Sequence, residues 1–155
     1  MKQYDSGIDK EGYCINWLKR NNIIQRIWNC NVATWWPDNS VEQTIKGWDF
    51  TLENGLNIDL KSQLGKYRNG YYTKVCISVE RKQNGIWKNC ALSKETDLWL
   101  IPTQVAENKI EIYSINRRQM AKIEQLPDLR IVFAGGKWQK IAILPFDSPL
   151  VTKLL

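Results

Sequence analysis

The chain has 155 residues, of which 43% are hydrophobic and 25% are charged. This length and composition are typical of one globular domain whose core is large enough to fold without a disulfide or a structural metal. The chain carries 22 Lys and Arg residues against 16 Asp and Glu residues, a net charge of +6. This surplus of positive charge favours a polyanionic partner.

The chain contains no histidine. This excludes Ser–His–Asp and Cys–His catalytic pairs, and also zinc sites that use imidazole. In an enzyme with this composition, proton transfer and metal binding would have to come from carboxylates, Lys, Tyr, Cys or water. The four cysteines, Cys14, Cys30, Cys76 and Cys90, form no Cys-x-x-Cys pair. Their wide spacing favours reduced thiols over a disulfide framework.

The N-terminal residues contain no apolar stretch of the kind found in signal peptides. No apolar run in the chain approaches the roughly 18–20 residues that are needed to cross a bilayer. We therefore expect a cytoplasmic protein that does not enter a membrane.

Hydrophobic periodicity predicts the elements in chain order. Apolar residues at helical spacing predict a helix over residues 8–20, and residues 23–36 are interpreted as a strand followed by an aromatic loop. Alternating runs at residues 47–52 and 56–61 flank a turn at residues 53–55. The Asn-Gly pair in this turn is a strong signal for a β-hairpin.

The remaining elements are mostly strands. We expect strands at residues 71–82, 97–102 and 109–114, with a second Asn-Gly pair at residues 84–85. A helix is expected at residues 116–125. A last hairpin is expected from residues 129–133 and 138–144, which flank two adjacent glycines. The expected fold class is therefore mixed, α+β or an α/β sandwich.

The first hairpin carries two acids and a lysine on its polar side. Alternation places Asp59 and Lys61 on one face of the second strand, opposite Ile58 and Leu60. Asp49 lies on the polar face of the preceding strand. One interpretation is a solvated sheet face whose acids are neutralised by a neighbouring cation.

Glu11 favours a different interpretation. It lies seven residues before Leu18, on the apolar face of the first helix. A buried lone carboxylate is costly and normally acquires a partner. It could be a structural residue bound to a backbone amide or to Lys61. Alternatively, it approaches Asp49, Asp59 and Lys61, where a divalent cation would relieve the repulsion among three acids.

The order of these residues resembles the PD-(D/E)XK nuclease superfamily. The shared pattern is Gly7 and Glu11 in the first helix, then Asp49, then nine residues, and then Asp59-Leu60-Lys61-Ser62. Within the superfamily, the chain resembles the small Holliday-junction resolvases and the group I intron homing endonucleases. The resemblance covers about residues 7–82 and is looser at residues 97–102. Trp48 stands where a proline is common, and Asp59 stands where Glu is more frequent.

The resemblance implies a restriction-endonuclease-like core, with a central mixed sheet flanked by helices, and a DNA endonuclease that depends on Mg²⁺ or on Mn²⁺ in its place. By this resemblance, Asp49, Asp59 and the Leu60 carbonyl would hold one or two Mg²⁺ ions, and Glu11 would add a direct or water-mediated ligand. Lys61 would orient or deprotonate the attacking water and stabilise the transition state. A nearby metal ion would lower the pKa of Lys61.

Basic and polar residues near the motif are candidates for DNA contact. These residues are Gln63, Lys66, Arg68, Lys74 and Arg117. Cations and hydrogen-bond donors of this kind contact phosphates. The alternative is that the segment from residue 66 to residue 74 is an ordinary polar loop, and for Gln63 a polar surface position is the favoured alternative.

The expected partner is double-stranded DNA, and the expected assembly is a homodimer or homotetramer. One active site cuts one strand, so a duplex break needs two sites related by symmetry. Site-specific cleavage of the homing or restriction type is the first hypothesis. Holliday-junction resolution and a non-catalytic DNA-binding protein of the same fold are the alternatives.

Overall fold

The fold was analysed in a computed structural model that describes residues 7–35, 48–65, 70–92 and 95–155. In the first helix, side chains are described from residue 12 onward. The described helices are α1 (Gly7–Arg20), α2 (Ile23–Trp28) and α4 (Arg117–Glu124). Among the described residues, no helix is both long enough and apolar enough to span a membrane.

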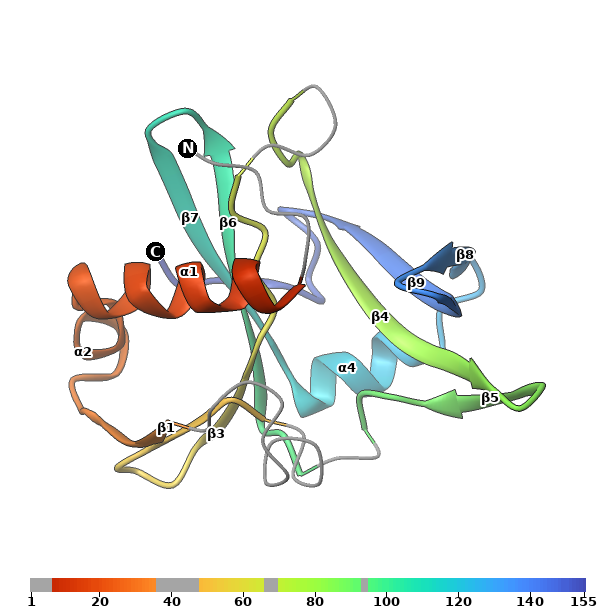
Figure 1. Ribbon diagram of the computed structural model, residues 1–155, viewed down its shortest axis with the longest axis horizontal. Helices are drawn as coiled ribbons and strands as arrows, with labels where there is room; N and C mark the ends of the chain where they lie inside the picture. Colours follow the sequence, from red (N-terminus) through yellow and green to blue (C-terminus); the bar gives the residue numbers. More distant parts are fainter. Residues whose placement is uncertain (1–6, 36–47, 66–69, 93–94) are drawn as a thin grey trace.

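The strands form two sheets (Figure 1). The first sheet has six strands in the order β1-β2-β3-β6-β7-β10. Their bounds are β1 (Val32–Trp35), β2 (Phe50–Leu52), β3 (Asn57–Leu60), β6 (Leu98–Ala106), β7 (Lys109–Asn116) and β10 (Thr152–Lys153). The second sheet has four strands in the order β5-β4-β9-β8. Their bounds are β4 (Lys74–Gln83), β5 (Ile86–Asn89), β8 (Arg130–Ala134) and β9 (Lys137–Pro145). The expected mixed α+β class is confirmed.

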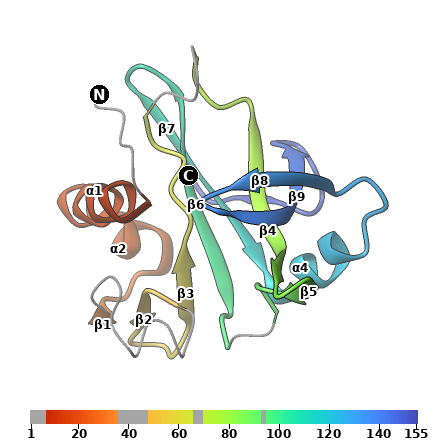
Figure 2. The same ribbon diagram turned by 45° about the vertical axis from the view of Figure 1, so that its right-hand side comes forward.

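The six-stranded sheet is covered on both faces. Figure 2 shows α1 and α2 on one side of β3, β6 and β7, with the four-stranded sheet and α4 on the other side. The core under the helices includes Leu18, Ile24, Phe50, Ile58, Leu60, Leu100 and Ile112. The core on the opposite face includes Val75, Ile77, Val79, Trp99, Ile101, Tyr113, Ile115, Met120 and Ile123. Adjacent residues of β6 alternate between the two cores, which is why almost the whole strand is apolar.

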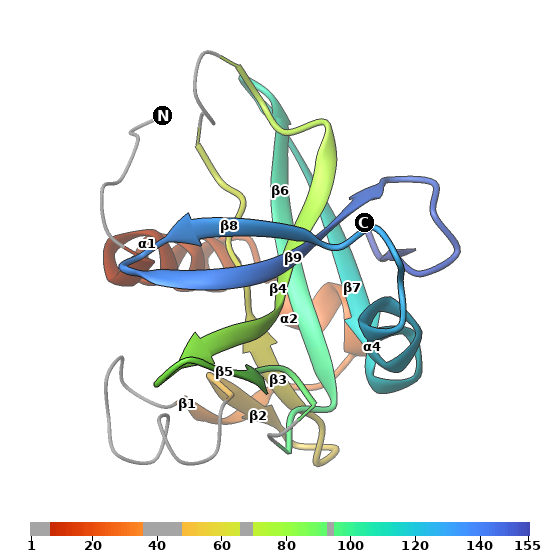
Figure 3. The ribbon, with the colours of Figure 1, turned by 90° about the vertical axis from the view of Figure 1, so that its right-hand side faces the viewer.

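The arrangement on the second face differs from the expected sheet flanked by helices. Strands β4 and β9 cover much of that face, together with α4 (Figure 3). The strand expected at residues 71–82 is present as β4, but it pairs with β5 and β9 and belongs to the second sheet. Burial of its alternating residues Val75, Ile77 and Val79 against β6 and β7 explains this position.

Strands β3 and β6 run parallel, with Asp59 opposite Trp99. Parallel neighbours need a crossover connection, and β4 and β5 lie within this one. The ladder continues with Lys61 N donating to Leu100 O at 2.8 Å and Gln63 N donating to Pro102 O at 2.8 Å. Pro102 has no N–H, so it returns no bond to β3. The regular pairing of β3 accordingly ends at Leu60.

The interpretation of residues 23–36 was wrong in its first half. Residues 23–28 form α2, and the strand β1 follows only at Val32–Trp35. The segment contains three β-branched residues, Ile23, Ile24 and Ile27, which favoured a strand. Their spacing also suits one face of a helix, and that face buries Ile23 and Ile24. Asn22 and Asn29 flank α2 in the left-handed conformation, with φ of 54° and 51°, which Asn adopts more easily than most residues.

The turn signals predicted the hairpins correctly. Gly55 has a φ of 89° in the β2–β3 turn, and Asn84 and Gly85 have φ of 52° and 78° between β4 and β5. The expected helix at residues 116–125 is α4, and the Asn116 side chain caps it by accepting a bond from Gln119 N at 2.8 Å. Strands β8 and β9 form the expected last hairpin.

Replacing Ile101 by alanine should destabilise the chain by about 2–5 kcal/mol, because Ile101 is 0% exposed between the two sheets and the vacated volume cannot collapse fully. Ile86→Ala is the matched control, because Ile86 is 61% exposed, and its cost should stay below about 1 kcal/mol. Urea unfolding of both variants measures the difference, and equal losses would contradict the described packing.

Candidate functional site

Asp49 is held at the end of the first hairpin. Its backbone N donates to Ile58 O at 2.9 Å, and its carboxylate Oδ2 accepts a bond from Leu60 N at 2.6 Å. Strand β2 begins at Phe50, so Leu60 lies beyond its partner strand. The Asp49 side chain takes the place of the missing backbone acceptor. The buried carboxylate therefore has a structural bond of its own.

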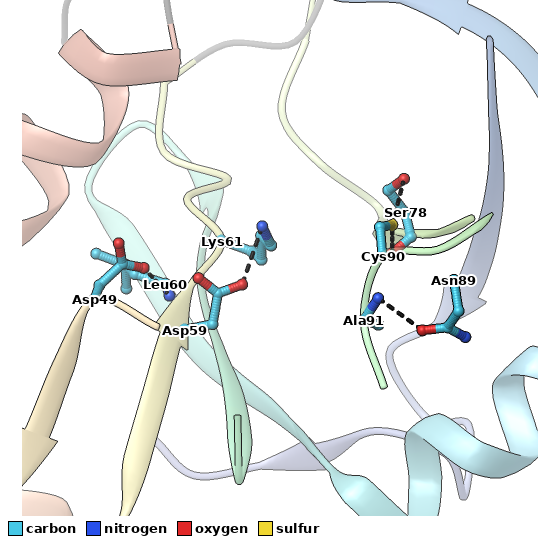
Figure 4. Close-up of polar contacts among 8 residues, drawn as sticks. All are labelled: Asp49, Asp59, Leu60, Lys61, Ser78, Asn89, Cys90 and Ala91. Carbon is cyan, nitrogen blue, oxygen red and sulfur yellow. Dashed lines mark hydrogen bonds and ion pairs between the residues drawn. The ribbon is translucent and has the colours of Figure 1, made fainter. Parts of the chain in front are cut away.

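Asp59 and Lys61 form an ion pair beside Asp49. The distance between Lys61 Nζ and Asp59 Oδ2 is 3.0 Å. Figure 4 shows both side chains on the side of β3 nearer to Ser78 and Cys90, with the Lys61 ammonium joined to the Asp59 carboxylate. The Asp59 side chain is 15% exposed and the Lys61 side chain is 40% exposed. The pair thus lies partly exposed on the face of β3 opposite Ile58 and Leu60, as alternation along the hairpin predicted for these two residues.

Burial and a second acid change the titration of Asp59. Burial raises its pKa from 3.8 to about 7, the Lys61 ammonium opposes this rise, and the neighbouring Asp49 carboxylate adds to it. The Asp49 and Asp59 carboxylates are therefore close enough to interact electrostatically. Near neutral pH this arrangement favours a cation or a proton at Asp59.

The pKa of Lys61 is raised, mainly by the charge of Asp59 and against the opposing effect of burial. This is the reverse of the lowered pKa that the sequence analysis expects beside a metal ion, because the protein's own carboxylates act on the ammonium. Lys61 is therefore charged at neutral pH. It can donate hydrogen bonds and stabilise negative charge, but it is poorly suited to removing a proton.

Three predicted site residues lie outside the described part of the chain. Glu11 belongs to α1, but its side chain is not among those described. Lys66 and Arg68 fall within residues 66–69, which are also outside it. Among the described residues, no group of three or more His, Cys, Asp and Glu side chains is placed to hold a metal ion. The described acids of the site are Asp49 and Asp59.

Gln63 is buried, which the sequence analysis missed in favouring a polar surface position. It is 5% exposed. Its Nε2 donates to Lys74 O and to Thr103 Oγ1, both at 3.2 Å, and its Oε1 accepts from Cys76 N at 2.8 Å. These bonds tie the segment after β3 to β4. The amide is fully used inside the protein, which favours a structural role over DNA contact.

Arg117 and Lys74 have contrasting positions. Arg117 donates to Thr96 O at 2.7 Å and to Leu92 O at 3.0 Å. Its guanidinium thus secures the chain before β6, which favours a structural role here too. Lys74 is exposed at the start of β4, where it remains a candidate for phosphate contact.

Lys74 lines a cavity of about 440 Å³ next to the hairpin motif. The cavity is also lined by Ser62, Tyr71, Tyr72 and Arg130. Ser62 directly follows Lys61, so the cavity adjoins the ion pair. Arg130 was not identified from the sequence, because it is far along the chain and only the pairing of β4, β9 and β8 brings it here. Cations and aromatic rings in one hollow suit phosphate and base contacts.

No protein-family model matches the chain, and no curated protein shows significant sequence similarity to it. What the chain does has to be inferred from the geometry of Asp49, Asp59 and Lys61 and from the surfaces around them.

Replacing Gln63 by alanine should cost about 1–3 kcal/mol of stability, because Cys76 N and Lys74 O would lose their buried partner. Gln63→Glu should also destabilise, since a carboxylate cannot donate to Lys74 O. Gln83→Ala, at an exposed position of β4, is the control. The measurement is urea unfolding. A Gln63→Ala variant as stable as the Gln83→Ala control would show that the hydrogen bonds from Gln63 to β4 contribute no stability.

Asp59 should make the chain less stable as the pH rises. Its folded pKa of about 7 lies above the ordinary 3.8, so the folded state binds more protons than the unfolded state between these values. The contribution is present in full below pH 3.8 and is lost as the pH rises through about 7. Asp59→Asn should therefore flatten the fall in unfolding free energy between pH 4 and pH 8. Parallel pH profiles for the two proteins would show that Asp59 titrates normally.

Proposed function

We propose that the chain is a divalent-cation-dependent DNA endonuclease that hydrolyses phosphodiester bonds. The observation that carries the proposal is the meeting of Asp49, Asp59 and Lys61 at the β2–β3 hairpin, with a 3.0 Å ion pair between the last two. Asp49 directly precedes β2 and Asp59 lies in β3, and Asp59 pays a desolvation cost that an exposed surface acid would avoid. This arrangement matches the hairpin motif of the PD-(D/E)XK pattern.

The two acids suit Mg²⁺ and equally Mn²⁺. Mg²⁺ prefers oxygen ligands and commonly uses one or two carboxylates together with water and substrate phosphates. Asp49 and Asp59 supply hard oxygen atoms, and the pKa of Asp59 is raised mainly by burial and further by the Asp49 carboxylate, whose negative charge a cation would neutralise. We propose that these two carboxylates and the Leu60 carbonyl hold the cation. Glu11, in α1, stays a candidate additional ligand.

Asp49 and Lys61 would then have separate tasks in the proposed site. A bound dication would draw the phosphate into the site and lower the pKa of a coordinated water. The Lys61 ammonium orients the attacking water and stabilises the negative charge that develops on the phosphate. Asp49 also accepts the bond from Leu60 N, which attaches its carboxylate to the residue that follows Asp59.

Double-stranded DNA is the proposed substrate, and the net charge of +6 supports it. Lys74 and Arg130 lie beside the cavity next to the motif, where they could contact the backbone of the DNA. Cleavage of the homing or restriction type, by a dimer or tetramer, is the first form of the proposal, and junction resolution is the second. A non-catalytic DNA-binding protein is the other candidate, because Asp49 and Asp59 each have a partner within the chain.

A plasmid-nicking assay in Mg²⁺ or Mn²⁺ tests the proposal. The wild type should nick supercoiled plasmid, whereas Asp59→Asn and Lys61→Ala should reduce the rate about 100-fold or more, because each removes a group that acts on the reacting phosphate. Lys153→Ala is the matched control, because it breaks another 3.0 Å ion pair, with Glu111, on a distant strand. It should leave the rate unchanged.

The substrates and the protein's stability separate the alternatives. Asp59→Asn is expected to be no less stable than the wild type at pH 8, so a loss of nicking cannot be assigned to unfolding. Faster cutting of a four-way junction than of linear duplex would favour junction resolution. Binding of DNA without any nicking above the rate of Asp59→Asn would identify the non-catalytic protein and overturn the enzyme proposal.

A further inference from the structure

A β-bulge changes the direction of Arg81 on β4. Before the bulge, Val75, Ile77 and Val79 alternate into the core, and unbroken alternation would send Arg81 the same way. The register shifts between Ser78 and Glu80. Ser78 pairs with Ile141 and Arg81 pairs with Gln139, and those two partners are two residues apart on β9. Cross-strand partners share a face, so the bulge places Arg81 on the face of Ser78, away from the core.

The Arg81 guanidinium has an unsatisfied donor. Its Nε is buried and has no hydrogen-bond partner. The neighbouring acid, Glu80, is paired with Lys140 at 3.0 Å, and in the described part of the chain no carboxylate forms an ion pair with Arg81. A buried donor without an acceptor is rare in folded proteins and calls for an explanation.

Arg81 also lies near the candidate site. It shares a face of β4 with Cys76 and Ser78. Lys61 lies on the side of β3 nearer to Ser78 (Figure 4), which shares its sheet face with Arg81. Cations from both sheets therefore lie on this side of the site, and among the described residues the carboxylate that pairs with Lys61 is Asp59. An anion between these cations would relieve their repulsion.

The Arg81 guanidinium indicates what kind of acceptor group would satisfy it. A guanidinium offers several N–H groups in a fixed fork, which matches two oxygens of one phosphate. Rotation of the flexible Arg81 side chain can bring Nε–H to a phosphate oxygen, so that a charge-assisted bond replaces an unmade one. Cys76 lies on the same face of β4 and lines the cavity that contains Lys74 and Arg130. The basic residues thus continue along one face of the second sheet.

We propose that Arg81 binds the phosphate on which Asp59 and Lys61 act, so that the nucleic-acid strand contacts both sheets. This inference rests on the proposed function for the identity of the substrate. It adds a substrate-binding residue from the second sheet, where the nuclease motif has no member. The bulge in β4 is the structural feature that makes Arg81 available.

Kinetics of plasmid nicking test the inference. Arg81→Met should reduce kcat/KM about 10- to 100-fold, as expected for the loss of a hydrogen bond to a charged group. Arg81→Lys should recover part of the rate, because it keeps the charge but loses the fork. Arg118→Met, at an exposed position of α4, is the control and should act like the wild type. Arg81→Met should also be at least as stable as the wild type in urea, because it removes an unsatisfied donor. A destabilised Arg81→Met variant would show a structural role instead and overturn the inference.

A second measurement separates this inference from the proposed function. The Nε–Hε resonance of Arg81, identified by its loss in Arg81→Lys, should shift when a short DNA duplex is added. Inorganic phosphate at the same concentration should shift it less, since a free anion lacks the other backbone contacts. A larger response to inorganic phosphate would make the site one for a free anion and overturn the assignment to DNA.

The two failures are then distinguishable. If the wild type nicks no DNA but the Arg81 resonance responds to the duplex, the endonuclease proposal fails and Arg81 remains a DNA-phosphate ligand. If the wild type nicks DNA, but Arg81→Met nicks equally well and the resonance does not respond, the inference about Arg81 fails alone.

Discussion

The one-sided packing of β3 is the constraint on which the candidate site depends. Ile58 and Leu60 are buried in the core beneath α1 and α2, so Asp59 and Lys61 have to project from the opposite face. Pairing on both edges, Phe50 with Ile58 and Ile58 with Leu98, fixes this register. A slip by one residue would drive both charges into the apolar core and expose Ile58 and Leu60, at a cost far above that of the observed pairing. The register that buries Ile58 and Leu60 therefore also determines the position of the Asp59–Lys61 pair.

A second feature decides what faces that pair. The buried amide of Gln63 bonds to the backbone of β4 at Lys74 and Cys76, so the strand that follows the motif stays attached to the second sheet. The same strand then carries Ser78 and Arg81 past Lys61. Burial of Val75 and Val79 holds the other face of β4 against β6 and β7. The candidate site thus has the acids Asp49 and Asp59 on the β2–β3 hairpin, and the second sheet contributes Arg81 from the face of β4 that points away from the core.

Local patterns in the sequence were enough to predict the hairpin and its charged face. Asn54-Gly55 and the alternation around it placed Asp59 and Lys61 correctly, because side-chain direction in a short paired strand depends only on parity. The burial of Gln63 could not be predicted in this way, since its partners Thr103 and Cys76 are contributed by strands that meet it only in the folded chain. The assignment of residues 71–82 to a second sheet was missed for the same reason. The helix α2 was missed because β-branched residues at helical spacing satisfy both patterns.

At Arg81 the alternation of side-chain directions along β4 is broken by a β-bulge. Unbroken alternation of β4 would put this guanidinium among Val75, Ile77 and Val79, where burial of an unpaired charge is prohibitive. The chain resolves the conflict with a bulge at Ser78–Glu80, at the cost of local ladder pairing. Packing of the core would be served equally well by an apolar residue at position 81 and a regular strand. A bulge that keeps an arginine beside Lys61, with a buried nitrogen that lacks an acceptor, is better explained by a phosphate that both cations bind.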